Sequence, residues 1–176
     1  SGTKTYNSNA TYEFNGGAAQ VTSTSLPGTI SGTLKINNSS GVSLSQSTTA
    51  TTVDMTLGNL DLGSNNLTLT TLSISLPSAT KMIIADDGEL RKTYTGDGAF
   101  TFPIGDNTSG DDYSPVTLDL VADGYSSAYV SAKVTDAKHP NNTSANSYLT
   151  RYWTVQQTGV TNPLYDISLY YVDGDV

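Results

Sequence analysis

A short phrase that recurs four times between Tyr12 and Leu90 limits the possible folds more than any other feature of the chain. In each copy, an apolar-x-apolar triplet is followed by a polar turn of four or five residues and then by a second apolar segment. The triplets are Tyr12–Phe14, Leu34–Ile36, Leu60–Leu62 and Met82–Ile84, so successive copies start 22, 26 and 22 residues apart. A period of this length is typical of solenoids, in which each repeat stacks on the one before it.

The spacing within each repeat predicts short β-strands that are separated by polar turns. A third apolar segment precedes each later triplet, as Ile30 precedes Leu34, so we expect three strands per coil. This pattern predicts a short right-handed parallel β-helix of about three to four coils, with alternate side chains stacked inward as ladders. The predicted ladders are Tyr12, Leu34, Leu60 and Met82, and beside them Phe14, Ile36, Leu62 and Ile84.

The pattern changes after Tyr94, where longer segments alternate without repeating. The predicted strands are Gly98–Pro103, Pro115–Leu120, Ala128–Thr135, Tyr148–Gln156 and Tyr165–Val172. Such spacing, with turn residues between the segments, favours an antiparallel β-sandwich, and the single Trp153 would pack in its core. We therefore predict an all-β chain with β-helix coils over 1–94 and an Ig-like capping sandwich over 95–176, which breaks off where the chain stops.

Composition narrows the classes of partner. The net charge is −8 and the eight basic residues are scattered, which argues against nucleic acid and against an anionic membrane surface. The chain lacks cysteine, and no apolar run is long enough to span a membrane. More than a quarter of the residues are Ser or Thr, which is common in β-rich extracellular proteins. With Ser1-Gly2 resembling a tag remnant, we expect a piece of a larger secreted protein.

One acidic loop is a candidate metal site. Between Gly105 and Tyr113 it carries Asp106, Asp111 and Asp112, whose oxygens suit a hard cation such as Ca²⁺. The loop lacks the spacing of a complete calcium-binding motif, so a solvated turn is the alternative explanation. No other cofactor is expected.

The sequence offers little that resembles a catalytic site. His139 is the only histidine, no G-x-S-x-G motif accompanies it, and a loop-fixing role is expected for it. Parallel β-helices also include polysaccharide-cleaving enzymes, which use paired carboxylates. Here two acids of the coils, Glu13 and Asp61, are expected to face outward in a column with Lys35 and Ile83. We interpret that column as a solvated face.

Tyrosines are the remaining candidates for ligand contacts. The chain has eleven, against three Phe and one Trp. Aromatic rings on a surface rich in Ser, Thr and Asn can act as platforms for sugars. Tyr125 and Tyr129, in the second half, are the predicted ligand-binding residues.

Several phrases resemble one group of bacterial proteins. They are Leu60–Leu69, Gly98–Asp106, Tyr113–Val116, Asp136–Asn142, Tyr148–Trp153 and Tyr171–Val176. These phrases, within residues 55–176, resemble recurring segments of adhesin-like, repeat-containing surface proteins of Bacteroidetes, many of which are associated with type IX secretion. The resemblance implies a location at the exterior of a Gram-negative cell. It implies no catalytic residues.

Two functions remain in competition at this stage. The first is a non-enzymatic structural or adhesion module of a large secreted surface protein, with neighbouring domains of the same chain, a glycan or another surface protein as partners. The alternative is a carbohydrate-binding module of a secreted glycan-active enzyme.

Overall fold

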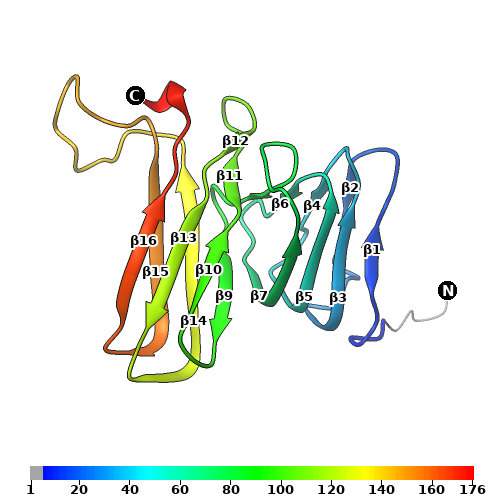
Figure 1. The fold of residues 1–176 in the computed structure, drawn as a ribbon. Coiled ribbons are helices and arrows are strands. Elements are labelled where there is room, and N and C mark those ends of the chain that lie inside the picture. Colours follow the sequence, from blue (N-terminus) through cyan, green and yellow to red (C-terminus); the bar gives the residue numbers. More distant parts are fainter. Residues whose placement is uncertain (1–5) are drawn as a thin grey trace.

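The computed structural model describes residues 6–176 and confirms an all-β chain built on a β-solenoid. Five parallel strands follow one another along the first sheet, so the solenoid has about five turns (Figure 1). The Ser1-Gly2 pair and the start of the polar N-terminal segment lie outside the described residues. Among residues 6–176, no helix is long and apolar enough to cross a membrane.

The first sheet has seven strands and runs through the whole molecule. Its strands, in spatial order, are β1 (Tyr12–Phe14), β3 (Thr29–Asn37), β5 (Thr48–Leu57), β7 (Leu67–Ile74), β9 (Leu90–Tyr94), β14 (Gly124–Thr135) and β15 (Tyr152–Thr161). Pairing is parallel from β1 to β9 and antiparallel from β9 onward. The last two strands therefore extend the sheet that the coils begin.

A second sheet of six short strands closes the other side of the coils. It contains β2 (Gln20–Val21), β4 (Val42–Ser43), β6 (Leu60–Asp61), β8 (Ile83–Ile84), β11 (Ile104–Asp106) and, antiparallel at the end, β12 (Asp112–Tyr113). The chain alternates between the two sheets, with one strand of each per turn. The prediction of three strands per coil was wrong. In the second copy, the segment before the triplet and the triplet itself form one long strand, since Ile30 and Leu34 both lie in β3. In the later copies, the triplet belongs to the second sheet and only the segment before it lies in the first sheet.

The predicted ladders are correct for their first step only. Tyr12 pairs with Leu34 and Phe14 with Ile36, as expected. Leu34 and Ile36 then pair with Val53 and Met55 rather than with Leu60 and Leu62. Leu60 belongs to the second sheet, where it pairs with Val42 and Ile83. The apparent repeat of 26 residues therefore compared a triplet on the first sheet, Leu34–Ile36, with a triplet on the second sheet that begins at Leu60. It left out the turn of the solenoid that contains β5.

Asparagine side chains connect each turn of the solenoid to the next. Asn38, only 1% exposed, donates from its amide to the backbone oxygen of Ala18 at 2.8 Å and to Gln20 at 3.0 Å. Asn59 accepts from the amide of Met82 at 3.0 Å. Such bonds satisfy turn backbone groups that would otherwise be left unpaired between stacked coils. The turns are packed so closely that a Cβ on Gly58 (φ +84°) would overlap the carbonyl oxygen of Asn38.

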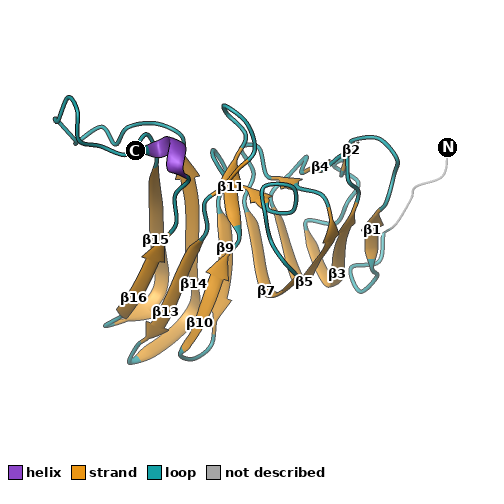
Figure 2. Cartoon of the chain, turned by 45° about the horizontal axis from the view of Figure 1, so that its top comes forward, coloured by secondary structure: helices purple, strands orange, loops and turns teal. Residues whose placement is uncertain are grey.

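The second half adds a third sheet of three antiparallel strands. These are β10 (Gly98–Phe102), β13 (Val116–Val121) and β16 (Leu164–Leu169), with β13 in the centre. A 3₁₀ helix, η1 (Asp173–Asp175), follows β16 (Figure 2). The five strands predicted here all exist, but the Ig-like sandwich is not confirmed. Two of the predicted strands, β14 and β15, belong to the coil sheet, because β14 pairs with the last coil strand β9 and β15 pairs with β14.

We call the part of the chain after Tyr94, residues 95–176, the extension. One hydrophobic core joins the coils to the extension. It runs without a break from Ile36 and Leu69 in the coils to Phe102, Leu118 and Val130 beyond them. Each fully buried side chain of this size contributes roughly 1.5–3 kcal/mol, so the ladders of several turns are needed to offset backbone ordering. Trp153 packs against this core but is only half-buried.

Candidate functional site

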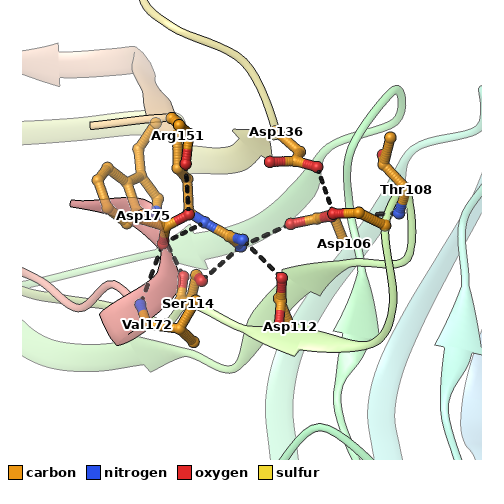
Figure 3. Close-up of polar contacts among 11 residues, drawn as sticks. Asp106, Thr108, Asp112, Ser114, Asp136, Arg151, Val172 and Asp175 are labelled. Atoms are coloured by element: carbon orange, nitrogen blue, oxygen red, sulfur yellow. Dashed lines mark hydrogen bonds and ion pairs between the residues drawn. The ribbon is translucent and has the colours of Figure 1, made fainter. Parts of the chain in front are cut away.

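The most unusual polar feature of the molecule is an arginine that is bound by three aspartates (Figure 3). Arg151 Nη1 lies 2.6 Å from Asp106 Oδ2, Nη2 lies 2.9 Å from Asp112 Oδ2, and Nε lies 2.9 Å from Asp175 Oδ2. Nη1 also donates to Ser114 Oγ at 2.7 Å. We call these five residues the Arg151 cluster.

Three separate segments meet at the Arg151 cluster. Asp106 ends β11 and Asp112 begins β12, Arg151 directly precedes β15, and Asp175 comes from η1 near the C-terminus. Asp175 is held further, because its backbone oxygen accepts from the Thr150 amide at 2.9 Å and its Oδ2 accepts from the Val172 amide at 3.1 Å. The cluster therefore ties the end of the second sheet, the last strand of the first sheet and the C-terminal segment together.

Most of the Arg151 cluster is withdrawn from water. The exposed fraction of the side chain is 1% for Arg151, 0% for Asp106 and 4% for Asp175, against 32% for Asp112. Burial raises the pKa of the Asp106 carboxyl, and this outweighs the opposing attraction of Arg151. Burial alone would lower the pKa of Arg151, but its hydrogen bond to Asp175 and the charge of Asp106 raise that pKa above its usual value.

The acidic loop that we predicted as a calcium site mainly serves the Arg151 cluster. Asp106 and Asp112 both bind the guanidinium, whereas Asp111 lies apart and accepts from Asn59 Nδ2 at 3.2 Å. Within residues 6–176, no group of three or more Asp, Glu, His or Cys side chains is arranged to hold a metal ion. Calcium binding stays a prediction that this arrangement does not support.

Sequence reasoning missed Arg151 because its partners lie far away along the chain. The separation is 45 residues to Asp106 and 24 to Asp175. The available signal was a lone basic residue beside the aromatic pair Tyr152-Trp153 at the start of a strand. The Nε1–H of Trp153 in turn donates to the backbone oxygen of Ser114 at 3.0 Å, next to the cluster.

The expected column of outward charges has a different composition. Lys35 Nζ lies 3.4 Å from Glu13 Oε1, and the next residue in that row is Asp54. Asp61, which we placed in the same column, lies on the second sheet and pairs with Ser43 and Ile84. Ile83 is buried. The prediction failed because it rested on the same misaligned repeat as the ladders.

His139 lies in the long loop before β15. Its ring packs edge-on against Tyr152, with centroids 4.9 Å apart, and its Nδ1 accepts from the Asn141 amide at 3.2 Å. These contacts agree with the loop-fixing role that we expected for it.

The two predicted ligand-binding tyrosines lie along one shallow pocket where the coils meet the extension. Tyr125 and Tyr129 line a space of about 450 Å³ together with Tyr94 from the end of β9. Thr68, Thr95 and Ser127 also line it. Pockets that hold small ligands have volumes from about 300 Å³ upward, so this one is large enough for a small ligand. We call it the tyrosine pocket.

Fixed contacts hold the rings of the tyrosine pocket in place. The Tyr125 hydroxyl donates to Asp97 Oδ1 at 2.6 Å, and Arg91 lies 5.1 Å from the centre of the Tyr129 ring. Burial, followed by the hydrogen bond to Asp97 and the charge of Asp97, raises the pKa of Tyr125 to about 12. Burial likewise raises the pKa of Tyr94 to about 12, and its hydroxyl is buried without a hydrogen-bond partner.

Comparisons with known proteins found no matching family model, no match among curated proteins and no match among solved structures. The resemblance to Bacteroidetes surface proteins therefore stays a prediction.

Proposed function

We propose that this chain is a non-enzymatic structural and adhesive module of a large secreted protein at the exterior of a Gram-negative cell. The observation that carries the proposal is the single seven-stranded sheet, which continues from the coils into the extension without a break. A shared sheet and a shared core make the two halves one mechanical unit. Such a unit suits a protein that must hold a fixed shape and present a surface.

The surface chemistry supports an exterior location. The charged fraction is only 14%, and Ser, Thr and Asn are frequent. Polar, uncharged side chains hydrate an exposed β-surface without attracting nucleic acid or anionic lipid. The sequence phrases that resemble segments of adhesin-like proteins point in the same direction.

The use of the carboxylates supports a role without catalysis. A hydrolytic site of the glycosidase type needs two carboxyl groups that face a substrate across roughly 5–10 Å. Here Asp106, Asp112 and Asp175 converge on Arg151, which neutralises part of their charge. In the coils, Glu13 pairs with Lys35.

The outer strand of the three-stranded sheet supports contact with a neighbouring domain. Tyr165, Ile167 and Leu169 of β16 pair with the buried Leu120, Leu118 and Val116 of β13, so they point to the same face of the sheet. They are nevertheless 36–45% exposed. A neighbouring domain of the same protein is the partner that we propose for this face.

Equilibrium unfolding in urea tests the single-unit structure on which this function depends. Fluorescence of Trp153, the only tryptophan, reports on the extension, whereas far-ultraviolet circular dichroism reports on all strands. We expect the two transitions to coincide, as they do for one cooperative unit. Separate midpoints would contradict the proposal, because they would mean that the coils and the extension unfold independently.

Location and catalysis are tested separately. Antibodies against the chain should label intact cells of the organism that makes it, and labelling only after lysis would refute the exterior location. A panel of neutral and acidic polysaccharides should show no new chain ends after incubation with the protein. Turnover that is abolished by one Asp→Asn or Glu→Gln change would refute the non-enzymatic role.

A further inference from the structure

We propose that the tyrosine pocket is a binding site for a neutral saccharide, with Tyr129 and Tyr125 as the contact rings. The proposal names the ligand class for the adhesive part of the function above and rests on that part. It is carried by four observations: an irregular backbone, the aromatic lining, the absence of charge in the lining, and a lining residue whose buried hydroxyl is unsatisfied.

The backbone beside the tyrosine pocket departs from a regular sheet. Tyr125 pairs with Val160 and Tyr129 with Thr158, so four steps along β14 face only two along β15. Within this bulge, Ser127 has a φ of 48°, which is costly for a residue with a Cβ. Bulges of this kind re-aim side chains and are frequent next to binding sites.

The opposite strand is adapted to the bulge. Gly159 of β15 has a φ of +71°, and a Cβ at this position would overlap the backbone oxygen of Ser126. The glycine thus lets the two backbones approach each other. Two neighbouring strands therefore accept a strained arrangement that places Tyr125 and Tyr129 on one pocket.

The lining of the tyrosine pocket has the chemistry that a sugar ring requires. Sugar rings present C–H groups on their faces and hydroxyl groups at their edges. Tyr125 and Tyr129 supply half-buried aromatic surface for the faces. Thr68, Thr95 and Ser127 contribute side chains with hydroxyl groups, which can both donate and accept hydrogen bonds.

The charges around the tyrosine pocket favour a neutral ligand. No residue that lines the pocket is charged. Charged groups that contact the lining residues already have partners. Arg91 Nη2 lies 3.0 Å from Glu89 Oε2, and Asp97 accepts from the Tyr125 hydroxyl and from the Ala122 amide. Lys92, whose Nζ lies 4.9 Å from the centre of the Tyr94 ring, donates to the backbone oxygen of Thr93 at 2.6 Å. An acidic or cationic sugar would find no free counter-charge in this lining.

One residue that lines the pocket carries an unsatisfied polar group. The Tyr94 side chain is 6% exposed, and its hydroxyl has no hydrogen-bond partner among residues 6–176. A buried hydroxyl without a partner costs free energy and calls for an explanation. Since Tyr94 also lines the pocket, we expect ligand binding to change the surroundings of this residue.

The test uses the whole chain and a panel of neutral oligosaccharides that contain glucose, galactose, mannose or xylose. Binding is followed by NMR of backbone amides at millimolar sugar. We expect at least one of these sugars to shift the amides of Ser127 and Tyr129, and Tyr129→Ala to weaken its binding about tenfold, as for loss of a central aromatic contact. Tyr129→Phe should retain binding, because it keeps the ring.

Tyr171→Ala is the matched control, since Tyr171 is 51% exposed and does not line the pocket. The affinity of the Tyr171→Ala variant for the sugar should stay within twofold of that of the parent. The proposal is overturned if no neutral sugar shifts the two amides, or if Tyr171→Ala weakens binding as much as Tyr129→Ala. Neither of these results affects the coincident unfolding transitions that test the structural role.

Discussion

The coils and the extension are stabilised by different kinds of polar contact. In the coils, uncharged amides such as Asn38 and Asn59 bridge neighbouring turns, and the Lys35–Glu13 ion pair lies at the surface with side chains 30% and 35% exposed. In the extension, a nearly fully buried arginine holds three aspartates. The first type of contact recurs from turn to turn, whereas the second occurs once.

This difference follows from how each region is built. A stacked turn contacts only its neighbours, so a short local bond can be repeated at every step. The extension must instead bring together segments that are up to 45 residues apart, and no repeat guides them. A buried ionic cluster is costly to leave incomplete, and it can therefore specify one arrangement. Stability in the extension should consequently depend on fewer residues than stability in the coils.

Removal of Arg151 should have the largest effect. Arg151→Ala leaves Asp106 and Asp175 buried without their cation, which should destabilise the fold by about 3–5 kcal/mol. Urea unfolding followed by Trp153 fluorescence measures this change. A loss below about 1 kcal/mol would show that water reaches the cluster and that the contrast between the two regions is wrong.

The pH dependence of the same variant sharpens the comparison. Burial already raises the pKa of Asp106, so its ionisation opposes folding, and that cost is relieved as pH falls through the folded-state pKa. Without Arg151 the attraction that lowers this pKa is lost, and the pKa rises further. The stability gap between Arg151→Ala and the parent should therefore narrow on acidification. A gap that widens towards acid pH would contradict this assignment.

Removal of one coil amide should have an intermediate effect. Asn38→Ala deletes bonds to Ala18 and Gln20 of the previous turn and leaves the Ser40 amide without its acceptor, at a cost of about 1–3 kcal/mol. The control is Asn37→Ala, whose amide meets the exposed Glu13 and should matter little. If both variants lose the same free energy of unfolding, the buried bonds of Asn38 contribute no more to stability than the exposed bond of Asn37.

The sequence predicted the class of fold well and the alignment of its turns poorly. Period-two alternation and turn residues identified the β-solenoid and all five longer strands after Tyr94. The repeat was misaligned because Leu34-Lys35-Ile36 and Leu60-Asp61-Leu62 are the same pattern on different sheets. A turn whose apolar pair is Val53 and Met55 was hidden by the threonines around it. Local pattern cannot distinguish two sheets that both need alternate apolar residues.

The candidate sites show the same limit. Tyr125 and Tyr129 were predicted together and are close in sequence. In the structure both of them line the tyrosine pocket. The acidic loop was also found, but its main partner was not, since Arg151 is brought to it by tertiary structure alone. Spacing along a chain can indicate a set of acidic side chains that could bind a cation. Only the fold determines which cation they bind, and here Asp106 and Asp112 bind the guanidinium of Arg151.

Replacement of Tyr94 should have a smaller effect and of opposite sign. Tyr94→Phe removes a buried hydroxyl that has no partner, so stability at neutral pH should rise or stay unchanged. The folded-state pKa of Tyr94 is raised from 10.0 to about 12, so the parent is fully stabilised below pH 10.0 and loses stability as pH rises towards about 12. Urea unfolding across this range should show a weaker alkaline loss for Tyr94→Phe. An equal alkaline loss in both proteins would contradict this assignment, because it would mean that the Tyr94 hydroxyl ionises in the folded protein at its ordinary pKa.

Removal of the surface ion pair should have the smallest effect and provides the reference for Arg151. In Lys35→Ala the partner Glu13 remains in water, and exposed pairs of this kind contribute little. The hydrogen bond from Asn37, with the charge of Lys35, lowers the pKa of Glu13 below 4.5. The stability that the Glu13 carboxylate contributes is thus present above pH 4.5 and is lost as pH falls through the folded-state pKa of Glu13. We expect Lys35→Ala to unfold at nearly the parent's urea midpoint, with any difference removed by salt. If Lys35→Ala and Arg151→Ala cost the same, burial does not distinguish the two regions.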